Sequence, residues 1–240
     1  MIKAVCFDLD GTLLPLDVDE FCKYYFGMLA RHMAPFGYER KALINSIMVG
    51  TKAMFQNDGS RTNEQAFWDE FCKIFGEDAR KDERKFAAFY ENEFDKAKAA
   101  CGFDPASAPA LRACREMGLR VCVATSPFFP RLATYKRLQW AGIDPNEVEF
   151  FTTYEDHCYC KPSLGYYREV LARLGLAPEE CLMVGNDVRE DMAARKLGMH
   201  VFLLVNDYLL NKDNADITAF PRGNFDDLLA YVKELKESKE

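Results

Sequence analysis

Five short apolar segments constrain the fold of this chain more than any other feature of its sequence. They cover residues 4–7, 120–124, 148–151, 181–184 and 201–205, and each is bounded by turn residues or charges. Apolar runs of this length are typical of strands that are buried on both faces of a parallel sheet. The sequence therefore predicts a sheet of five strands.

Helical segments separate the later strands. They cover residues 106–117, 131–141, 164–174 and 189–197, and a glycine follows each of them. Strands and helices that alternate with short connections predict an α/β fold with a doubly wound parallel sheet, whose ligands bind at the carboxyl ends of the strands. A last helix is expected on the flank of the sheet, with an apolar face formed by Leu228, Leu229, Val232 and Leu235.

Residues 16–102 interrupt this alternation, because their apolar residues recur only with helical spacing. Three helical stripes follow the first one, and one of them begins after a possible capping box at Thr62 and Gln65. We therefore predict an α/β core domain at 1–15 and 103–240 and an inserted helical bundle, the cap domain, at 16–102. The aromatic residues of the stripes are expected to form the core of the bundle, and the first stripe consists of Phe21, Tyr24, Tyr25, Met28 and Leu29.

Composition and charge narrow the class of protein. Of the 240 residues, 49% are hydrophobic and 29% are charged, as in ordinary globular proteins. The net charge is −7 and the Lys and Arg residues are scattered, so we expect no nucleic-acid or membrane partner. The nine cysteines lack a disulfide framework, and the first apolar stretch ends at Asp8 without forming a secretory leader. We expect a soluble, cytoplasmic protein with free thiols, whose oligomeric state the sequence does not predict.

Two aspartates directly follow the first apolar segment. Asp8 and Asp10 are two residues apart, which directs both side chains to the same side, and Gly11 follows where the chain must turn. Acidic residues before a glycine also occur as plain turn or helix-capping clusters. The pair alone leaves a catalytic and a structural role open.

Residues Asp8 to Thr12, with the sequence Asp-Leu-Asp-Gly-Thr, resemble the first motif of the haloacid dehalogenase (HAD) superfamily in its phosphotransferase branch. Thr125 is similar to the second motif, Lys161 before a proline to the third, and Asp187 with Asp191 to the acidic fourth. The four motifs occur in the family's order at four predicted strand ends and span the whole α/β part. The resemblance implies a HAD-like phosphatase with an inserted helical cap.

The resemblance implies that Asp8 is the nucleophile and forms an aspartyl-phosphate. Asp10 would protonate the leaving oxygen and then activate the water that hydrolyses this intermediate. Phosphoryl transfer to a carboxylate also requires countercharge and positioned hydrogen-bond donors. The residues expected to bind the phosphate are Thr125 and Lys161, through their side chains, and Leu9 and Ser126, through their backbone N–H groups.

The resemblance also implies a Mg²⁺ cofactor, a hard cation that prefers oxygen ligands. Asp8, the backbone carbonyl of Asp10 and the carboxylate of Asp187 would hold the ion. Asp191 is a direct ligand, a ligand through water, or only the acid that opens the following helix, and these interpretations stay open.

Two positions depart from the family's pattern. Asn186 precedes Asp187, and Ser126 stands where an asparagine is common. Because Ser126 carries a hydroxyl like Thr125, the second motif could be shifted by one residue, although the strand register favours Thr125. These departures concern the geometry of the metal and phosphate sites, not the predicted class of enzyme.

Several alternatives concern function. Asp10 argues against the removal of halide from carbon, because the dehalogenating branch lacks this second aspartate. A sugar-phosphate mutase of the same superfamily would keep every motif, and a non-catalytic interaction domain would keep the fold. The predicted function is Mg²⁺-dependent hydrolysis of a small phosphorylated metabolite, whose leaving group the cap would select.

Two polar segments have a weaker link to function. Lys52, Asn57 and Arg61 either face the site or lie exposed on the surface, and exposure is the favoured interpretation. The run from His157 to Cys160 lacks the separated pairs of a zinc site, so we expect no metal there.

Overall fold

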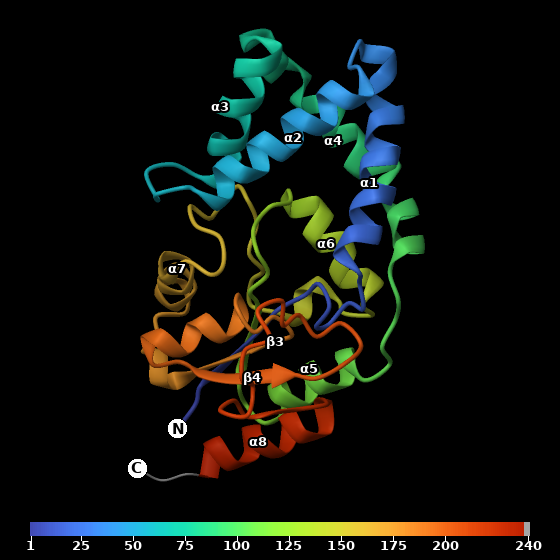
Figure 1. The fold of residues 1–240 in the computed structure, drawn as a ribbon. Coiled ribbons are helices and arrows are strands. Elements are labelled where there is room, and N and C mark those ends of the chain that lie inside the picture. Colours follow the sequence, from blue (N-terminus) through green and yellow to red (C-terminus); the bar gives the residue numbers. More distant parts are fainter. Residues whose placement is uncertain (238–240) are drawn as a thin grey trace.

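Five parallel strands form one sheet in the order β2-β1-β3-β4-β5 (Figure 1). The computed structural model describes residues 1–237, and residues 238–240 of the predicted core domain lie outside the described residues. The sheet confirms the predicted fold class. The strands are β1 (Ala4–Phe7), β2 (Arg120–Val123), β3 (Cys181–Gly185), β4 (His200–Leu204) and β5 (Arg222–Gly223).

The predicted strand at residues 148–151 is wrong. Phe151 forms a single isolated bridge with Val123, and the N–H of Glu149 donates to the carbonyl of Val121 at 2.8 Å. Val123 makes two more backbone hydrogen bonds with this segment, to the carbonyl of Phe150 and from the N–H of Thr152, each at 3.0 Å. A 3-10 turn at Pro145–Glu147 precedes the segment and a loop follows it, so this short contact does not extend into a strand. The fifth strand is instead β5, a two-residue edge strand whose residues are exposed or half-buried and therefore form no apolar run.

Alternate side chains of β1, β2, β3 and β4 enter two separate cores, as expected for a sheet covered on both faces. In β1, Val5 and Phe7 face one core, and Ala4 and Cys6 face the other. The first core contains α5 (Ser107–Glu116), α6 (Arg131–Trp140) and α8 (Phe225–Glu237), and the second contains α7 (Leu164–Leu174) and the 3-10 segment η6 (Asp191–Leu197). These elements confirm the predicted helices, except that 189–197 is a shorter 3-10 segment. None of the helices within residues 1–237 is long and apolar enough to cross a membrane.

Four helices gather at the end of the molecule away from α8 (Figure 1). They are α1 (Val18–Met33), α2 (Arg40–Phe55), α3 (Asn63–Phe75) and α4 (Glu83–Asn92). The predicted capping box at Thr62 and Gln65 is present at the start of α3. The first apolar stripe is buried except for Tyr24, which is 46% exposed because it lies at the edge of the stripe.

The chain leaves the sheet for these helices and returns from them at adjacent positions. Leu16 and Cys101 form an isolated antiparallel bridge, and the N–H of Gly102 donates to the carbonyl of Pro15 at 2.7 Å. The two connecting segments therefore lie side by side. The division into a core and a cap domain at these positions stays a prediction.

A second contact attaches the helical part to the α/β part. Asn63 at the start of α3 is fully buried, and its side-chain amide donates to the carbonyls of Pro127 and Tyr159 at 3.4 and 3.3 Å. Its backbone N–H donates to the carbonyl of His157 at 2.8 Å. The thiol of Cys160 packs against Met54 of α2. The run from His157 to Cys160 thus supports the base of α2 and α3.

His157 should make the fold sensitive to acid. Its side chain is 2% exposed, and burial lowers its pKa from 6.5 to about 4. The unfolded chain therefore takes up a proton below pH 6.5 while the folded protein does not, so stability falls between pH 6.5 and pH 4 by about 3 kcal/mol in total.

We expect His157→Gln to remove this contribution. Urea unfolding at pH 7, 5.5 and 4.5 should show a shallower loss of stability for the variant than for the wild type. Equal slopes for the two proteins would show that the pKa of His157 is the same in the folded and the unfolded protein.

Candidate active site

Asp8 lies at the carboxyl end of β1, where the strand order changes direction. The chain passes from β1 to β2 on one side and later to β3 on the other side of β1. Side chains that follow β1 and β3 therefore share the crevice that forms at such a point. The N–H of Asp8 continues the sheet by donating to the carbonyl of Val184 at 2.8 Å.

The carboxylate of Asp8 is held by two donors from different segments. The ammonium of Lys161 lies 2.7 Å from Oδ1, and the hydroxyl of Thr12 lies 3.1 Å from Oδ2. Lys161 is 1% exposed, and its ammonium also contacts Oδ1 of Asp191 at 2.6 Å. Burial alone would lower the pKa of Lys161, but the charges of Asp191 and Asp8 outweigh it and raise this pKa above its ordinary value. Lys161 therefore remains charged between two carboxylates.

Gly11 and Asn186 fit closely beside Asp8. Gly11 has a φ of 80°, and a Cβ atom on it would lie 2.3 Å from Nδ2 of Asn186, so only glycine fits there. The side-chain carbonyl of Asn186 lies 2.8 Å from the hydroxyl of Thr12, which also contacts Asp8. The prediction did not assign Asn186 to the site, although its place directly before Asp187 was a signal.

Asp187 and Asp191 organise the turn that follows β3. Oδ1 of Asp187 accepts the N–H groups of Arg189 and Glu190 at 2.8 and 2.9 Å. Asp191 is 1% exposed; its Oδ1 contacts Lys161, and its Oδ2 accepts the N–H of Asp187 at 2.9 Å. Both aspartates line the cavity, but both oxygens of Asp191 are engaged, so that Asp191 orients Lys161.

The expected phosphate-binding groups lie next to Asp8. Thr125 is 3% exposed and follows β2, the neighbour of β1, and both Thr125 and Ser126 line the same cavity as Asp8. Within residues 1–237, neither the N–H of Leu9 nor the N–H of Ser126 donates a hydrogen bond. These two donors are therefore available to an anion in front of Asp8.

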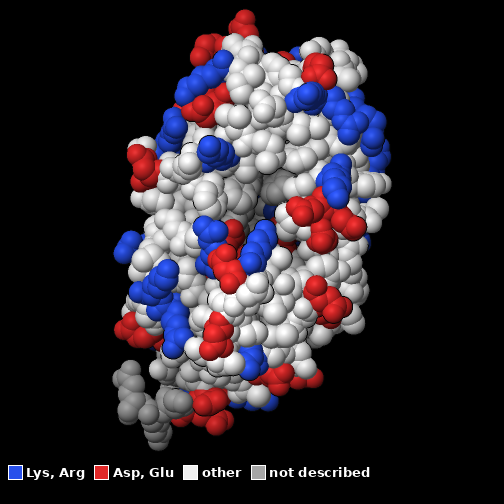
Figure 2. Space-filling model, viewed as in Figure 1, with Lys and Arg blue, Asp and Glu red and all other residues white. Residues whose placement is uncertain are grey.

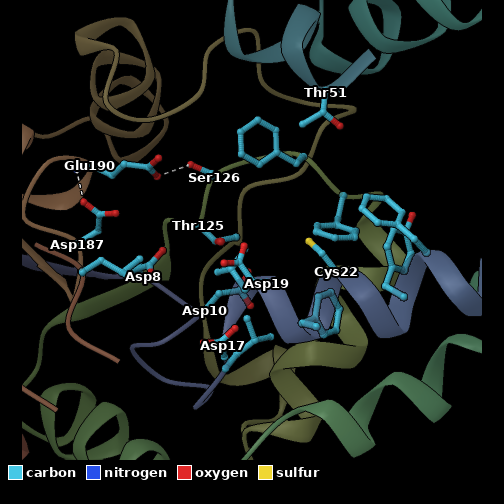
Figure 3. Close-up of a pocket in the computed structure, with 18 of the residues that line it drawn as sticks. Asp8, Asp10, Asp17, Asp19, Cys22, Thr51, Thr125, Ser126, Asp187 and Glu190 are labelled. Atoms are coloured by element: carbon cyan, nitrogen blue, oxygen red, sulfur yellow. Dashed lines mark hydrogen bonds between the residues drawn. The ribbon is translucent and has the colours of Figure 1, made fainter. Parts of the chain in front are cut away.

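Glu190 is a second acidic residue that the prediction missed. Burial raises its pKa to about 7, against the lowering effect of the Lys161 charge, and its carboxylate accepts the hydroxyl of Ser126 at 3.2 Å. Figure 3 shows this hydrogen bond beside Asp187. Glu190 stands in the predicted 189–197 helix, where no sequence pattern distinguishes it from the other acidic residues.

Asp10 faces the cavity beside a buried arginine from α6. The guanidinium of Arg137, which is 1% exposed, donates to Oδ2 of Asp10 and to the hydroxyl of Thr134, and it stacks over the ring of Phe129. Oδ1 of Asp10 has no hydrogen-bond partner among the described residues. Burial raises the pKa of Asp10 above its ordinary value, and the Arg137 charge limits this rise.

A cavity of about 520 Å³ joins these groups to the four helices. Figure 2 shows a hollow in the middle of one face of the molecule, and Figure 3 shows the acidic residues on one side of the cavity and aromatic rings on the other. Lys52, Asn57 and Arg61 do not line it; the Asn57 amide donates to Asn63, and Arg61 pairs with Asp69. The predicted site residues that do line it are Asp8, Asp10, Thr125, Ser126, Asp187 and Asp191.

The atoms in front of Asp8 are oxygens, which are the ligands that a hard cation such as Mg²⁺ prefers. The Asp8 carboxylate and the Asn186 side-chain carbonyl converge on the same hydroxyl of Thr12, and Asp187 lines the adjacent space. Among residues 1–237, no group of three or more His, Cys, Asp and Glu side chains is arranged to hold a metal. A cation here would therefore depend on carbonyl, amide, water and phosphate oxygens as well as on carboxylates.

Known proteins that resemble this chain include one relative by sequence and two solved structures. "Putative phosphatase YhcW" of Bacillus subtilis (strain 168) is 25% identical over 213 residues, which cover 86% of this chain and 84% of the relative. The structure of a HAD phosphatase from Thermococcus onnurineus has a TM-score of 0.57 at 18% identity and covers 99% of both chains. A defluorinating L-2-haloacid dehalogenase has a TM-score of 0.58 at 16% identity and covers 97% of this chain and 95% of its own.

The two structural similarities show the fold alone, since one of the two structures is a phosphatase, the other is a dehalogenase, and both are less than 20% identical to this chain. The family is shown by a sequence model described as "haloacid dehalogenase-like hydrolase", which matches residues 2–198. This match includes Asp8 and Asp10 after β1, Thr125 after β2, Lys161 and the turn after β3. The chain belongs to the haloacid dehalogenase-like hydrolase family.

Proposed function

We propose that this hydrolase is a Mg²⁺-dependent phosphomonoesterase that acts on a small phosphorylated metabolite through an aspartyl-phosphate on Asp8. The observation that carries the proposal is the shared cavity of Asp8 and Asp10, with Lys161 bonded to the carboxylate of Asp8. The names of relatives support phosphate chemistry, because they include "Putative phosphatase YhcW" of Bacillus subtilis. The family resemblance supports it too, because dehalogenating members lack the second aspartate.

In the first step, an oxygen of Asp8 attacks the phosphorus atom and the bond to the leaving oxygen breaks. Asp10 donates its proton to that oxygen, so the product leaves as a neutral alcohol. The raised pKa of Asp10 favours the protonated form that this step requires. Lys161, the Thr125 hydroxyl and the N–H groups of Leu9 and Ser126 would stabilise the charge on the phosphoryl oxygens.

In the second step, Asp10 takes a proton from water, and the water oxygen attacks the phosphorus atom of the aspartyl-phosphate. The bond between phosphorus and Asp8 breaks, which releases inorganic phosphate and restores the carboxylate. The proton taken from water restores the acid form of Asp10. One residue therefore serves as acid and as base.

Asp8, the backbone carbonyl of Asp10 and Asp187 would hold the Mg²⁺ ion, and Asn186 offers a further oxygen beside them. When bound, the ion supplies positive charge that lets two anions, the carboxylate and the phosphate, approach each other. Asp191 has both oxygens engaged by Lys161 and by the N–H of Asp187, which favours a role in orienting Lys161 over direct binding to the metal.

We further propose that α1 to α4 form a cap over the site at residues 16–102, since they line the cavity opposite the catalytic aspartates (Figure 3). A sugar-phosphate mutase is the alternative within this family, because it would use the same phosphoenzyme. The presence of both Asp8 and Asp10 in one cavity argues against a purely structural domain.

The nucleophile and the metal can be tested without knowledge of the natural substrate. With p-nitrophenyl phosphate and Mg²⁺ we expect steady turnover, a loss of activity with EDTA, and a loss of at least about 1,000-fold for Asp8→Asn. Unfolding of Asp8→Asn by urea should show a folded protein. Turnover that survives in this variant would disprove the mechanism, whereas phosphate that stays on Asp8 until a sugar phosphate is added would show a mutase.

Arg137 should set the pH range of the acid step. Turnover requires protonated Asp10 and therefore falls as pH rises through its pKa, which the Arg137 charge lowers. Arg137→Met should raise this pKa and move the alkaline limb of kcat/KM upward by about one pH unit.

Gln139→Met is a matched control, because Gln139 is exposed on the same helix. Its alkaline limb should coincide with that of the wild type. A limb that does not move in Arg137→Met would show that Asp10 is not the acid whose titration limits turnover.

A further inference from the structure

The cavity extends from the catalytic aspartates into the interior of the four helices. At one end it is lined by Asp8, Asp10 and Thr125, and its far wall comes from all four of α1, α2, α3 and α4. Asp10 lies between the two parts in Figure 3. A substrate whose phosphate contacts Asp8 would therefore direct its leaving group past Asp10 and into the helical part.

The helical part of the cavity is apolar and aromatic. Its wall includes Phe21, Leu29, Ile47, Phe67, Trp68 and Phe86. The hydroxyl groups of Tyr25 and Tyr90, which also line it, bond to each other at 2.6 Å and so satisfy one another. This surface offers many ring and methyl contacts to a ligand. Its polar groups include the hydroxyl of Thr51 and the indole N–H of Trp68, which has no hydrogen-bond partner among the described residues.

The charged residues that line the cavity disfavour binding of a substrate with a second anionic group. Among the described residues that line it, none of those from α1 to α4 is basic, and the only basic residue is Lys212, which is exposed on a loop after β4. Asp17 and Asp19 stand at its edge beside Asp10 (Figure 3). A carboxylate or second phosphate on the leaving group would lose its hydration here without gaining a cation.

We propose that the substrates are phosphate monoesters of uncharged, apolar alcohols with an aromatic or branched hydrocarbon body that packs into the helical part of the cavity. This inference rests on the proposed phosphatase function and gives its substrate class. Bisphosphates, phosphorylated carboxylic acids and polyhydroxylated sugar phosphates are selected against. A cavity of about 520 Å³ falls within the range of roughly 300–1,000 Å³ that is usual for small-molecule sites.

A series of primary-alcohol phosphates tests the substrate class, because its members share the same reacting bond. The series is ethyl, butyl, hexyl and 2-phenylethyl phosphate, with 2-phosphoglycolate as the anionic member. We expect kcat/KM to rise about three- to fourfold for each added CH₂ that enters the cavity and at least about tenfold from ethyl to 2-phenylethyl phosphate. Turnover of 2-phosphoglycolate above that of 2-phenylethyl phosphate would overturn the inference.

Filling the cavity tests where the leaving group binds. Cys22 is half-buried on α1 and lines the cavity next to the aromatic rings (Figure 3). Cys22→Phe should lower the ratio of kcat/KM for 2-phenylethyl over ethyl phosphate at least about tenfold. Lys23→Phe places the same side chain at an exposed position of α1 outside the cavity and should leave this ratio unchanged. Equal ratios in the wild type and Cys22→Phe would place the leaving group elsewhere.

Two controls separate this inference from the proposed function. Acetyl phosphate needs no helical contacts, so its turnover and the loss of that turnover in Asp8→Asn report on the catalytic residues alone. Calorimetric binding of 3-phenylpropylphosphonate and phosphonoacetate in the presence of Mg²⁺ needs no turnover. Tighter binding of the phenyl compound without any hydrolysis would refute only the phosphatase function. Hydrolysis of acetyl phosphate with tighter binding of phosphonoacetate would refute only the substrate class.

Discussion

The buried ammonium of Lys161 between the carboxylates of Asp8 and Asp191 is the interaction on which the site depends. Removing a charged group from water costs free energy, and here this cost is offset because the ammonium and each carboxyl group are paired. The single ammonium is already shared between two acidic side chains, so it cannot also neutralise an approaching phosphate. In the proposed mechanism, the added positive charge of a divalent cation in front of Asp8 would compensate for the phosphate.

The α/β part and the four helices contribute different kinds of interaction to the same cavity. The ends of β1, β2 and β3 place charges and N–H groups within hydrogen-bonding distance of one another, where backbone geometry fixes their positions. The four helices contribute apolar area, whose effect on binding depends on how much of a ligand it covers. Asp10 lies at the border and is tied to Arg137, so the acid that would serve the leaving group is anchored to the α/β part.

The sheet and the acidic motif could be predicted because their signals are local. Apolar runs marked four of the five strands, and Asp8 and Asp10 follow the first of them directly. The edge strand Arg222–Gly223 could not be found, because it buries too little to leave an apolar pattern. Arg137 and Glu190 were missed for another reason: each acts through a partner far away in the sequence, and no pattern within a single helix identifies that partner.

The bridge between Leu16 and Cys101 has a consequence for how such a molecule can diversify. Because the chain departs and returns at one point, the inserted helices can change in length and composition without shifting the register of any strand. The contacts that must be kept or replaced include those of Asn63 with the carbonyls of Pro127 and Tyr159 and that of Lys136 with Asp95. Under the proposed function, selectivity for the alcohol can therefore change through the helices while the residues at the strand ends, which would react with the phosphate, stay the same.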